Sequence, residues 1–563
     1  MKGDSLTMDE LAHLPAGYSY LTQKDMRLNP EHPPLLKDLS AIPLLFIKGI
    51  NFPAEIKDWK EDINGQWGFG NIFLFKSGNP ADKMIFWGRI PMILVLIILG
   101  IYLFRWTKEL FGNKAGLLAL FLFSFSPTFL AHGRLVTTDV GAATGAFIAT
   151  YYFVKFLKDN SKKNLLKAGI VFGLAELAKF SLILLIPFFG ILVFCWALLK
   201  SANFKLFLKN FFRYLGYFLL IIIIGYILVW LVYIYHTWNY PAEKQLSDAQ
   251  SILASTRFKS LAKLVFWAME KPILRPLAQY FFGLFMVFQR ATGGNTGYFL
   301  GEVSAAGWKT YFPVVYSIKE PLAFYVLTLI GLLYLAWIIK KPFWQNTWQR
   351  LTFWLKGHLA ELSMLLFIFI YWLTSLASDL NIGVRHLLPV FPFTISLVSG
   401  VILIWLKPPR LLIKTGFLFL LLFWQALSVI LIYPHFLAYF NELVGGPNEG
   451  YKYVVDSNLD WGQDLKRLKK WVDENNIDKI YIDYFGGADI EYYLKEKCAR
   501  WSGTRNPEEF PKKSYLAVSA TFLQIGRGLP VPGFDQPKGF YQWLNDYTPV
   551  AKIGYSIFVY KID

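Results

Sequence analysis

The sequence predicts an all-α polytopic membrane domain followed by a small α/β domain at the C-terminal end that lies outside the bilayer. Three observations lead to this fold class. Apolar residues make up 55% of the 563-residue chain and charged residues only 17%, which is a low share for a soluble protein. The apolar residues are concentrated in roughly ten long runs. After Pro434 the composition changes to that of a soluble domain.

Each of the ten runs is close to the roughly 20 residues that a helix needs to cross the hydrocarbon core of a bilayer. The predicted spans are 84–104, 114–131, 136–154, 164–179, 180–199, 213–235, 320–339, 360–378, 384–406 and 411–433. They fall into two transmembrane groups, 84–235 and 320–433, which the polar segment 236–319 separates.

Lysine and arginine are distributed unevenly between the loops, and this predicts the orientation of the chain. The loops rich in these residues are 105–114, 155–167, 200–213, 340–356 and 407–414. Because cytoplasmic loops carry such an excess, we expect a multi-pass protein of the cytoplasmic membrane. Its extracytoplasmic regions are then 1–83, 236–319 and 434–563.

Residues 1–83 would have to cross the membrane although no apolar segment precedes them. Long polar N-terminal segments seldom do so without a signal or a leading helix. We therefore expect a further transmembrane helix ahead of Met1.

The extracytoplasmic regions contain their own predicted elements. A juxtamembrane helix is expected over 35–48 and an amphipathic interfacial helix over 261–286. In the tail, the spacing of Leu465, Leu468 and Val472 predicts a helix over 459–474. The segments predicted as strands are 479–485, 514–520 and 553–560.

The net charge of +18 does not indicate a nucleic-acid-binding protein, because the basic residues cluster between apolar spans. Only Cys195 and Cys498 are present, so a disulfide framework is not expected. Glu10 and His13 do not form the zinc motif His-Glu-x-x-His, because its first histidine is absent.

The first candidate site is the adjacent pair Asp9-Glu10. A general base for transfer to a hydroxyl must lie near the acceptor and be ionised at the working pH. The pair also fits a helix N-terminus, with Thr7 or Asp9 as the cap and Glu10 favoured by the helix dipole. Both interpretations stay open for this pair.

The second candidate is the run Glu31-His32-Pro33-Pro34, which Lys37 follows. The two prolines restrict the backbone and would present Glu31 and His32 at a defined place. Lys37 could then meet a phosphate as a point charge. The alternative is an ordinary proline-rich entry into a helix.

Two further polar turns lie at the outer ends of predicted spans. The segment from His132 to Asp139 includes Arg134, and Asp139 begins a helix that enters the membrane. An ionisable residue there is costly and is usually functional, although an N-cap is the alternative. Arg385 and His386 occupy the second turn, where an arginine suits a lipid phosphate or extends to the headgroups.

Together these motifs resemble the bacterial lipid-carrier-dependent glycosyltransferases related to protein O-mannosyltransferases, which have the GT-C membrane fold. The resemblance rests on Asp9-Glu10-Leu-Ala-His13, Arg27-Leu-Asn-Pro-Glu31-His32-Pro-Pro-Leu-Leu-Lys37, His132-Gly-Arg134-Leu-Val-Thr-Thr-Asp139 and Val384-Arg385-His386-Leu-Leu-Pro389. It extends into the tail through the run Asp456-Ser-Asn-Leu-Asp-Trp-Gly-Gln-Asp464.

The resemblance implies a sugar, a mannose-like hexose, carried on a polyprenyl phosphate, and transfer with inversion to a hydroxyl of a protein, lipid or glycan acceptor. The residues that carry over as catalytic are Asp9, Glu10 and Asp139. Those for the donor phosphate are Lys37, Arg385, His32 and Arg134, and those that position substrate are Glu31, His13 and His386. No cofactor is certain, and a divalent metal ion stays open. No nucleic-acid partner is expected.

Two other function classes remain as alternatives. A transporter or flippase of lipid-linked sugars would place ionisable residues at mid-membrane, where only Glu176 and Lys179 are candidates here. A non-catalytic sugar-binding membrane protein would keep its outer carboxylates away from any cavity. The gathering of polar groups at the outer ends of the spans favours the transferase.

Overall fold

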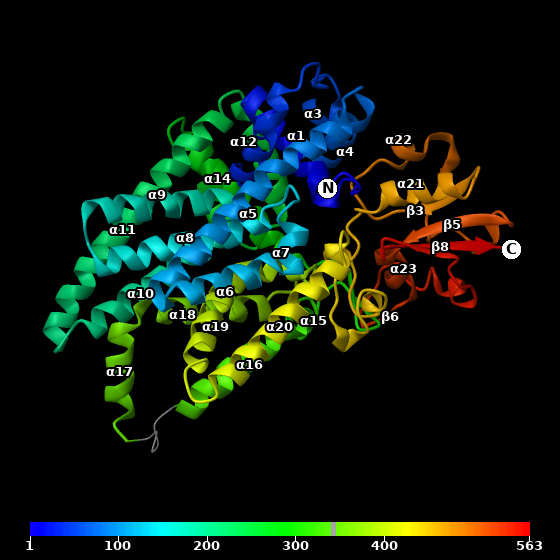
Figure 1. Cartoon of the computed structure of the whole chain (residues 1–563). Coiled ribbons are helices and arrows are strands. Elements are labelled where there is room, and N and C mark those ends of the chain that lie inside the picture. Colours follow the sequence, from blue (N-terminus) through cyan, green and yellow to red (C-terminus); the bar gives the residue numbers. More distant parts are fainter. Residues whose placement is uncertain (339–344) are drawn as a thin grey trace.

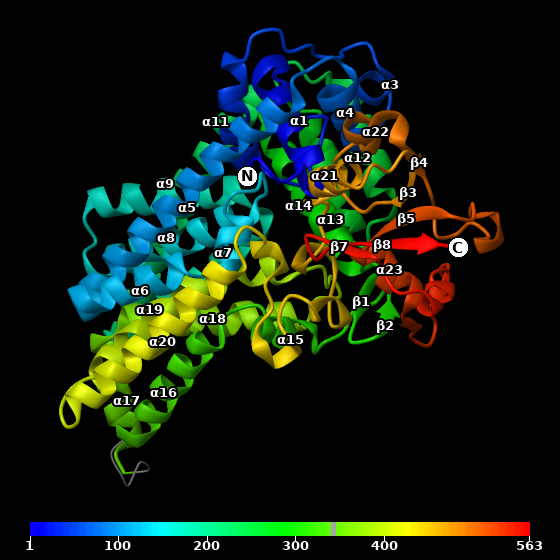
Figure 2. The same ribbon diagram turned by 45° about the vertical axis from the view of Figure 1, so that its right-hand side comes forward.

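The structure is a computed structural model that describes residues 1–338 and 345–563. Residue 339, at the end of the predicted span 320–339, and the first residues of the basic loop 340–356 lie outside the described residues. An elongated bundle of helices forms one body, and the tail forms a smaller domain of strands and short helices beside it (Figure 1). The N-terminal segment lies at the end of the bundle that faces the tail in both views (Figures 1 and 2).

The N-terminal segment is built on α1 (Met8–Gln23). This helix begins after Thr7, because Glu10 folds back and accepts hydrogen bonds from the backbone nitrogen and the hydroxyl of Thr7, both at 2.9 Å. The helix-start interpretation of the pair Asp9-Glu10 is therefore correct for Glu10. The segment continues with α2 (Leu35–Ala41), α3 (Lys57–Lys60) and α4 (Gln66–Asn71).

The juxtamembrane helix predicted over 35–48 is shorter than expected. Helix α2 ends at Ala41, and a 3-10 turn, Ile42–Phe46, replaces the rest. Pro43 explains the change, because its ring nitrogen cannot donate the hydrogen bond that would continue the helix.

All ten predicted spans fall on helices. Their bounds are α5 (Ala81–Phe111), α6 (Asn113–Ser124), α7 (Pro127–His132), α8 (Asp139–Lys158), α9 (Lys162–Ala178), α10 (Leu185–Leu199), α11 (Phe204–His236), α16 (Leu322–Ile338), α18 (Leu359–Leu376), α19 (Phe391–Trp405) and α20 (Leu411–Leu431). A short helix, α17 (Thr347–Gly357), precedes α18. The prediction of a helical membrane domain is confirmed.

Among the described residues, seven helical stretches are long and apolar enough to cross a membrane, or eight if a bent pair counts as one span. The bent pair joins α15 (Tyr311–Ile318) to α16 at an angle of 108°. The predicted span 114–131 is broken between α6 and α7, because Pro127 holds Ser126 in an extended conformation. Helix α9 has 17 residues and falls just short of a span.

The segment between the two transmembrane groups contains α12 (Ala242–Ile252), α13 (Lys259–Met269), α14 (Arg275–Gly293) and two short strands, β1 (Gly297–Phe299) and β2 (Glu302–Ser304). The single helix predicted over 261–286 is therefore wrong, and two helices replace it. Pro272 lies in the break, where it restricts the residue before it and removes a donor.

The tail folds around a five-stranded sheet of order β4-β3-β5-β8-β7, so the predicted α/β domain is confirmed. The strands are β3 (Ile480–Asp483), β4 (Cys498–Arg500), β5 (Ser514–Ser519), β7 (Ala551–Ile553) and β8 (Ile557–Ile562). Its helices are α21 (Leu465–Glu474), α22 (Ile490–Leu494) and α23 (Ala520–Arg527).

Two details of the tail differ from the prediction. The strand expected over 553–560 is a hairpin of β7 and β8, and the helix expected from residue 459 begins only at Leu465. The residues before Leu465 instead run as extended and turn structure against the membrane domain. In addition, β6 (Leu529–Pro530) pairs with β2, which ties the tail to the segment 236–319.

Candidate active site

A cavity of about 220 Å³ lies where the N-terminal segment, the outer ends of the bundle and α14 meet. Seven of the ten residues predicted as site residues line it: Asp9, His13, Glu31, His32, Asp139, Arg385 and His386. Further lining residues are Trp67, Lys179, Arg290 and Tyr371. These residues are up to about 380 positions apart in the sequence, so the fold alone brings them together.

A chain of alternating charges runs along the wall of this cavity. Arg385 Nη1 lies 2.6 Å from Asp9 Oδ2 and 3.4 Å from Asp139 Oδ2. Asp139 Oδ1 in turn accepts a hydrogen bond from Lys179 Nζ at 2.5 Å. The side chains of Asp139 and Arg385 are buried, whereas the Asp9 side chain is 22% exposed. The charges of the two carboxylates and the two cations therefore cancel. Asp9 is the most exposed of the four groups.

The electrostatics of Asp9 keep its carboxylate ionised. Burial alone would raise the pKa of Asp9, but the charge and the hydrogen bond of Arg385, together with the other groups around the carboxylate, hold the pKa below its ordinary value. Oδ2 is taken by Arg385, while Oδ1 has no hydrogen-bond partner among the residues that the structure describes. One oxygen of a charged carboxylate is thus free to accept a proton or a hydroxyl hydrogen bond from a ligand.

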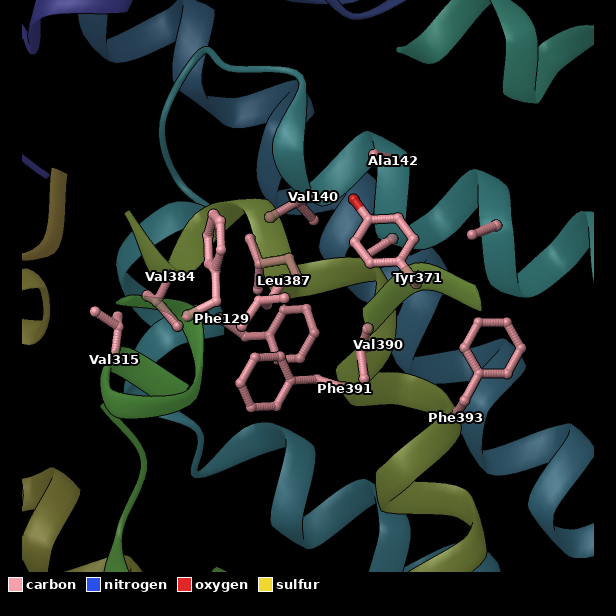
Figure 3. Packing of buried hydrophobic residues seen from close by; sticks show 14 of the residues in the cluster. Phe129, Val140, Ala142, Val315, Tyr371, Val384, Leu387, Val390, Phe391 and Phe393 are labelled. Atoms are coloured by element: carbon pink, nitrogen blue, oxygen red, sulfur yellow. The ribbon is translucent and has the colours of Figure 1, made fainter. Parts of the chain in front are cut away.

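The turn that carries Arg385 is a 3-10 helix, Val384–Val390, at the start of α19. Its apolar side chains pack with Phe129 and Val140 in the buried cluster seen in Figure 3, which fixes the turn from below. Gly383 is required just before it, because a Cβ at that position would lie 2.2 Å from Ser457 Oγ of the tail. The bundle and the tail therefore hold the arginine between them.

Two histidines face the cavity from neighbouring elements. His13 follows Asp9 by one helical turn on α1, and its ring lies 4.9 Å from the His32 ring, edge to face. Nδ1 of His13 is 2.9 Å from the Val136 carbonyl oxygen, which can only accept, so this nitrogen carries the proton and Nε2 is left with its lone pair. Burial lowers the pKa of both histidines, so both rings are neutral near pH 7.

Glu31 also lines the cavity, but the segment around it holds its carboxylate. Gln66 Nε2 donates to Oε1 at 2.7 Å and Asn64 Nδ2 donates to Oε2 at 3.1 Å. The side chain is thereby fixed at the cavity wall as a hydrogen-bond acceptor. Its predicted task, substrate positioning, is compatible with this location.

Lys37 does not reach the cavity, in contrast to the prediction that it meets a phosphate. Its ammonium is 1% exposed and donates to Tyr20 Oη at 2.8 Å, to the carbonyl oxygens of Asn29 and His32 at 2.8 and 2.7 Å, and to Asn29 Oδ1 at 3.0 Å. All three of its protons are used inside the protein. Lys37 therefore orders the segment that presents Glu31 and His32.

Glu10 is turned away from the cavity and does not line it. Arg89 Nε and Nη2 donate to its two oxygens at 2.8 and 2.6 Å, and the backbone nitrogen of Val136 adds a bond at 3.0 Å. With the two bonds from Thr7, the carboxylate is saturated and fully buried. Its geometry is that of an anchor between α1 and α5 rather than of a reacting group.

Arg134 is likewise turned away from the cavity. Nη1 lies 2.9 Å from Asp4 Oδ2, and Asp4 also receives Arg467 Nη2 of the tail at 2.6 Å. Nη2 of Arg134 is 3.4 Å from the carbonyl oxygen of Pro434. The predicted phosphate ligand is thus part of an ionic contact that joins the N-terminal segment, the bundle and the tail.

Lys179 and Arg290 were missed as site residues by the sequence reasoning. Lys179 is a single charge between apolar helices, and that isolation was the signal that could have found it. Arg290 lies on α14 and is exposed at the cavity, with no acidic partner among residues 1–338 and 345–563. Its sequence context, at the end of an amphipathic helix, gave no indication of a site.

The donor set of the cavity does not fit a resident divalent cation. Asp9 and Asp139 already share Arg385, and Lys179 takes the remaining oxygen of Asp139. Within the described parts of the chain, His, Cys, Asp and Glu side chains form no group of three that could hold a metal ion.

The chain is similar in structure to the oligosaccharyltransferase AglB of Archaeoglobus fulgidus, solved with an inhibitory peptide and a dolichol-phosphate, at 12% identity and a TM-score of 0.43. That likeness covers 91% of this chain and 66% of AglB, so the chain spans slightly less than two thirds of the relative. ArnT of Cupriavidus metallidurans, solved bound to undecaprenyl phosphate, is similar at 11% identity with a TM-score of 0.27, over 99% of this chain and 94% of ArnT.

No curated protein sequence matches the chain. A protein-family model does match it over residues 81–230, the stretch that contains Arg89, Arg134, Asp139 and Lys179. That family is described as dolichyl-phosphate-mannose-protein mannosyltransferase, and the first half of the membrane domain is similar to it.

Proposed function

We propose that the protein is a membrane glycosyltransferase that moves a sugar from a polyprenyl-phosphate donor to an acceptor hydroxyl. The observation that carries the proposal is the row of charges Asp9, Arg385, Asp139 and Lys179 along one cavity. It combines an ionised carboxylate with an open oxygen and buried cations within reach of a phosphate. The family match over residues 81–230 supports the same reaction class.

In this reaction Asp9 is the general base. Its open oxygen takes the proton of the acceptor hydroxyl while that hydroxyl's oxygen bonds to the anomeric carbon. The bond between the anomeric carbon and the phosphate oxygen breaks, and its electron pair leaves with the polyprenyl phosphate. A single displacement of this kind inverts the anomeric centre, and a phosphate leaving group makes a nucleotide unnecessary.

The negative charge that develops on the leaving phosphate needs donors that are already in position. Arg385 and Lys179 are held at the wall by Asp9 and Asp139, and Arg290 adds an unpaired charge at the cavity. His32 faces the same space as a neutral ring that can donate one hydrogen bond. Asp139 thus serves by orienting the two buried cations.

Three of the residues implied by the resemblance receive supporting tasks in this proposal. Glu10 joins α1 to the bundle through Arg89, Lys37 orders the segment of Glu31 and His32, and Arg134 binds Asp4. Each acts by holding another element, and none of the three lines the cavity. His13, Glu31 and His386 face the cavity and are proposed to position the sugar or the acceptor.

The proposed location is the extracytoplasmic face of the cytoplasmic membrane. The lysine- and arginine-rich loops 105–114, 155–167, 200–213 and 407–414 follow helix ends that carry no cavity-lining residue, which supports a cytoplasmic position for those loops. The segments 1–83 and 434–563 pack against each other at the cavity end, as required if both are on one side. A mannose-like hexose is the proposed sugar, and the acceptor is a protein, lipid or glycan hydroxyl.

The test is a transfer assay with the full-length protein in lipid nanodiscs. It is given polyprenyl-phosphate mannose or polyprenyl-phosphate glucose together with an extract of envelope acceptors, and release of polyprenyl phosphate is followed. Asp9→Asn should lower the rate by about 10²–10⁴-fold, since it removes the base. Asp25→Asn is the matched control, because Asp25 is also buried and paired with an arginine, Arg27, but lies outside the cavity.

Asp25→Asn should transfer at the wild-type rate per folded molecule. A wild-type protein that releases no polyprenyl phosphate from either donor, or an Asp9→Asn variant as active as the wild type, would contradict the proposal.

A further inference from the structure

The tail segment 456–464 lies directly behind the cavity wall and contacts the elements that carry the charged residues. Val384 is the residue before Arg385, and its backbone nitrogen donates a hydrogen bond to Asn458 Oδ1 at 2.9 Å. Ser5 lies just ahead of α1, and its backbone nitrogen donates a hydrogen bond to the carbonyl oxygen of Gln463, also at 2.9 Å. The segment therefore binds the backbone next to Arg385 and the backbone just ahead of the helix that carries Asp9.

Trp461 is the residue of this segment that touches all three site-bearing elements. Its indole covers the Arg385 guanidinium at 4.2 Å from the ring centroid. Its carbonyl oxygen accepts a hydrogen bond from the nitrogen of Met8, the neighbour of Asp9, at 3.0 Å. Its side chain shares a small buried cluster with Ala131 and Leu135, in the turn that leads to Asp139.

The indole is rigid and almost fully buried, at 1% exposure. Its own backbone nitrogen donates to Gln463 Oε1 at 2.9 Å, so the residue is fixed from its own segment as well. A guanidinium over an aromatic face is attracted to the ring, and the attraction strengthens when both are removed from water. The face of Trp461 thus fixes the plane of Arg385, while Asp9 and Asp139 fix its end.

We infer that Trp461 is a positioning residue of the active site, through which the extracytoplasmic domain sets Arg385 against Asp9 and Asp139. The effect on the transfer rate rests on the proposed function. The effect on the orientation of Arg385 rests only on the contacts described above. Without the indole face, the guanidinium can rotate away from the line that joins the two carboxylates. A shift of about 1 Å in such a group can lower a rate by about 10²-fold.

The test compares Trp461→Leu and Trp461→Phe with a matched control, Trp501→Leu. Trp501 is also a buried tail tryptophan that covers an arginine, with the Arg505 guanidinium 4.8 Å from its ring, but it is remote from the cavity. All three variants lose packing, so rates are expressed per folded molecule, as judged by gel filtration and thermal unfolding in detergent.

We expect Trp461→Leu to lower kcat by about 10–100-fold while the KM for the donor changes less than about threefold. Trp461→Phe keeps an aromatic face and should recover part of kcat, and Trp501→Leu should keep all of it. Wild-type kcat in Trp461→Leu, or an equal loss in Trp501→Leu, would overturn the inference. So would a Trp461→Phe variant as slow as Trp461→Leu.

A second measurement separates this inference from the proposed function, because it needs no substrate. Thermal unfolding is measured for Arg385→Gln, for Trp461→Leu and for the double variant. If the ring and the guanidinium act on one another, the double variant loses less Tm than the two single losses added together. In a second cycle, which pairs Arg385→Gln with Trp501→Leu, the losses of Tm should be additive. Additive losses in both cycles would refute the positioning role, even if sugar transfer had been demonstrated.

Discussion

The first turn of α1 presents two carboxylates to two different environments. Asp9 faces the cavity, pairs with Arg385 through one oxygen and keeps the other open. Glu10, its neighbour, faces the bundle, and both of its oxygens are saturated by Arg89, Thr7 and Val136. Both pKa values lie below their ordinary values, because the arginine and the other hydrogen-bonding neighbours together outweigh burial in each case. The two residues differ in unused hydrogen-bonding capacity, not in charge.

This difference separates groups that can act on a ligand from groups that hold the protein together. A buried ionised group with every lone pair or proton used inside the fold cannot bind a substrate without breaking a native contact. The same criterion places Lys37 with Glu10, because all of its protons are used within the protein. Arg134 keeps an unpartnered Nε but pairs with Asp4 away from the cavity, so it also holds the protein together. Lys179 and Arg385 line the cavity with Asp9. The predictions below test this division.

The largest loss of stability is expected when the charge of Glu10, which faces the bundle, is removed. Glu10→Gln leaves Arg89 buried without its counterion, and breaking such a pair by one partner typically costs about 3–5 kcal/mol. Asp9→Asn should cost less, because Arg385 keeps Asp139. Urea or thermal unfolding in detergent measures both. If Asp9→Asn were the more destabilising variant, the division between the two faces of α1 would be wrong.

A second test measures how the contribution of Lys37 to stability changes with pH. Burial lowers the pKa of Lys37 from 10.5 to about 7, with Glu31 opposing the shift. Between about pH 7 and pH 10 the unfolded chain therefore holds a proton that the folded chain releases, so the stability contributed at this position rises with pH in that window.

Replacing the lysine by methionine removes this dependence while keeping most of the side-chain volume. The Tm of the wild type should rise relative to that of Lys37→Met when both are measured at pH 7, 8 and 9. Other titrating groups are common to both proteins and cancel. Parallel curves would mean that Lys37 does not titrate in this range.

The smallest effect is expected at the exposed cation of the cavity. Arg290→Gln should raise the KM for the donor by a few-fold, and more at low ionic strength, because an exposed charge is screened by salt. Lys263→Gln is the control, as Lys263 is exposed on the neighbouring helix α13 and outside the cavity. An Arg290→Gln variant with an unchanged KM at low salt would remove this residue from the donor site.

The sequence was sufficient for part of the site and for most of the helices. Asp139 and Arg385 were predicted from their location at the outer ends of apolar helices and from the resemblance, and both line the cavity. Glu10 and Lys37 were misjudged since sequence proximity says nothing about direction: residues 9 and 10 of a helix point about 100° apart. Lys37 is held mainly by carbonyl oxygens, which no side-chain pattern reveals.

Trp461 illustrates a different limit. The run Asp456–Asp464, which contains it, is part of the resemblance, but none of the predicted site residues lies in it. Its contact with Arg385 joins residues 76 positions apart, and its contact with Met8 joins residues more than 450 positions apart. Local periodicity carries no information about pairings over such distances.

The hydrogen bond from Ser5 to Gly462 spans 457 residues and has a consequence for how the protein is made. At about 5–20 residues per second, a ribosome needs roughly 20–90 s to go from one partner to the other. During that interval α1 is already synthesised, but neither Trp461 nor the Arg385 turn that Asp9 will join exists for most of it. For most of its synthesis the nascent chain therefore lacks the contacts that complete the cavity around Asp9, and α1 stays without its tail partners until the tail emerges.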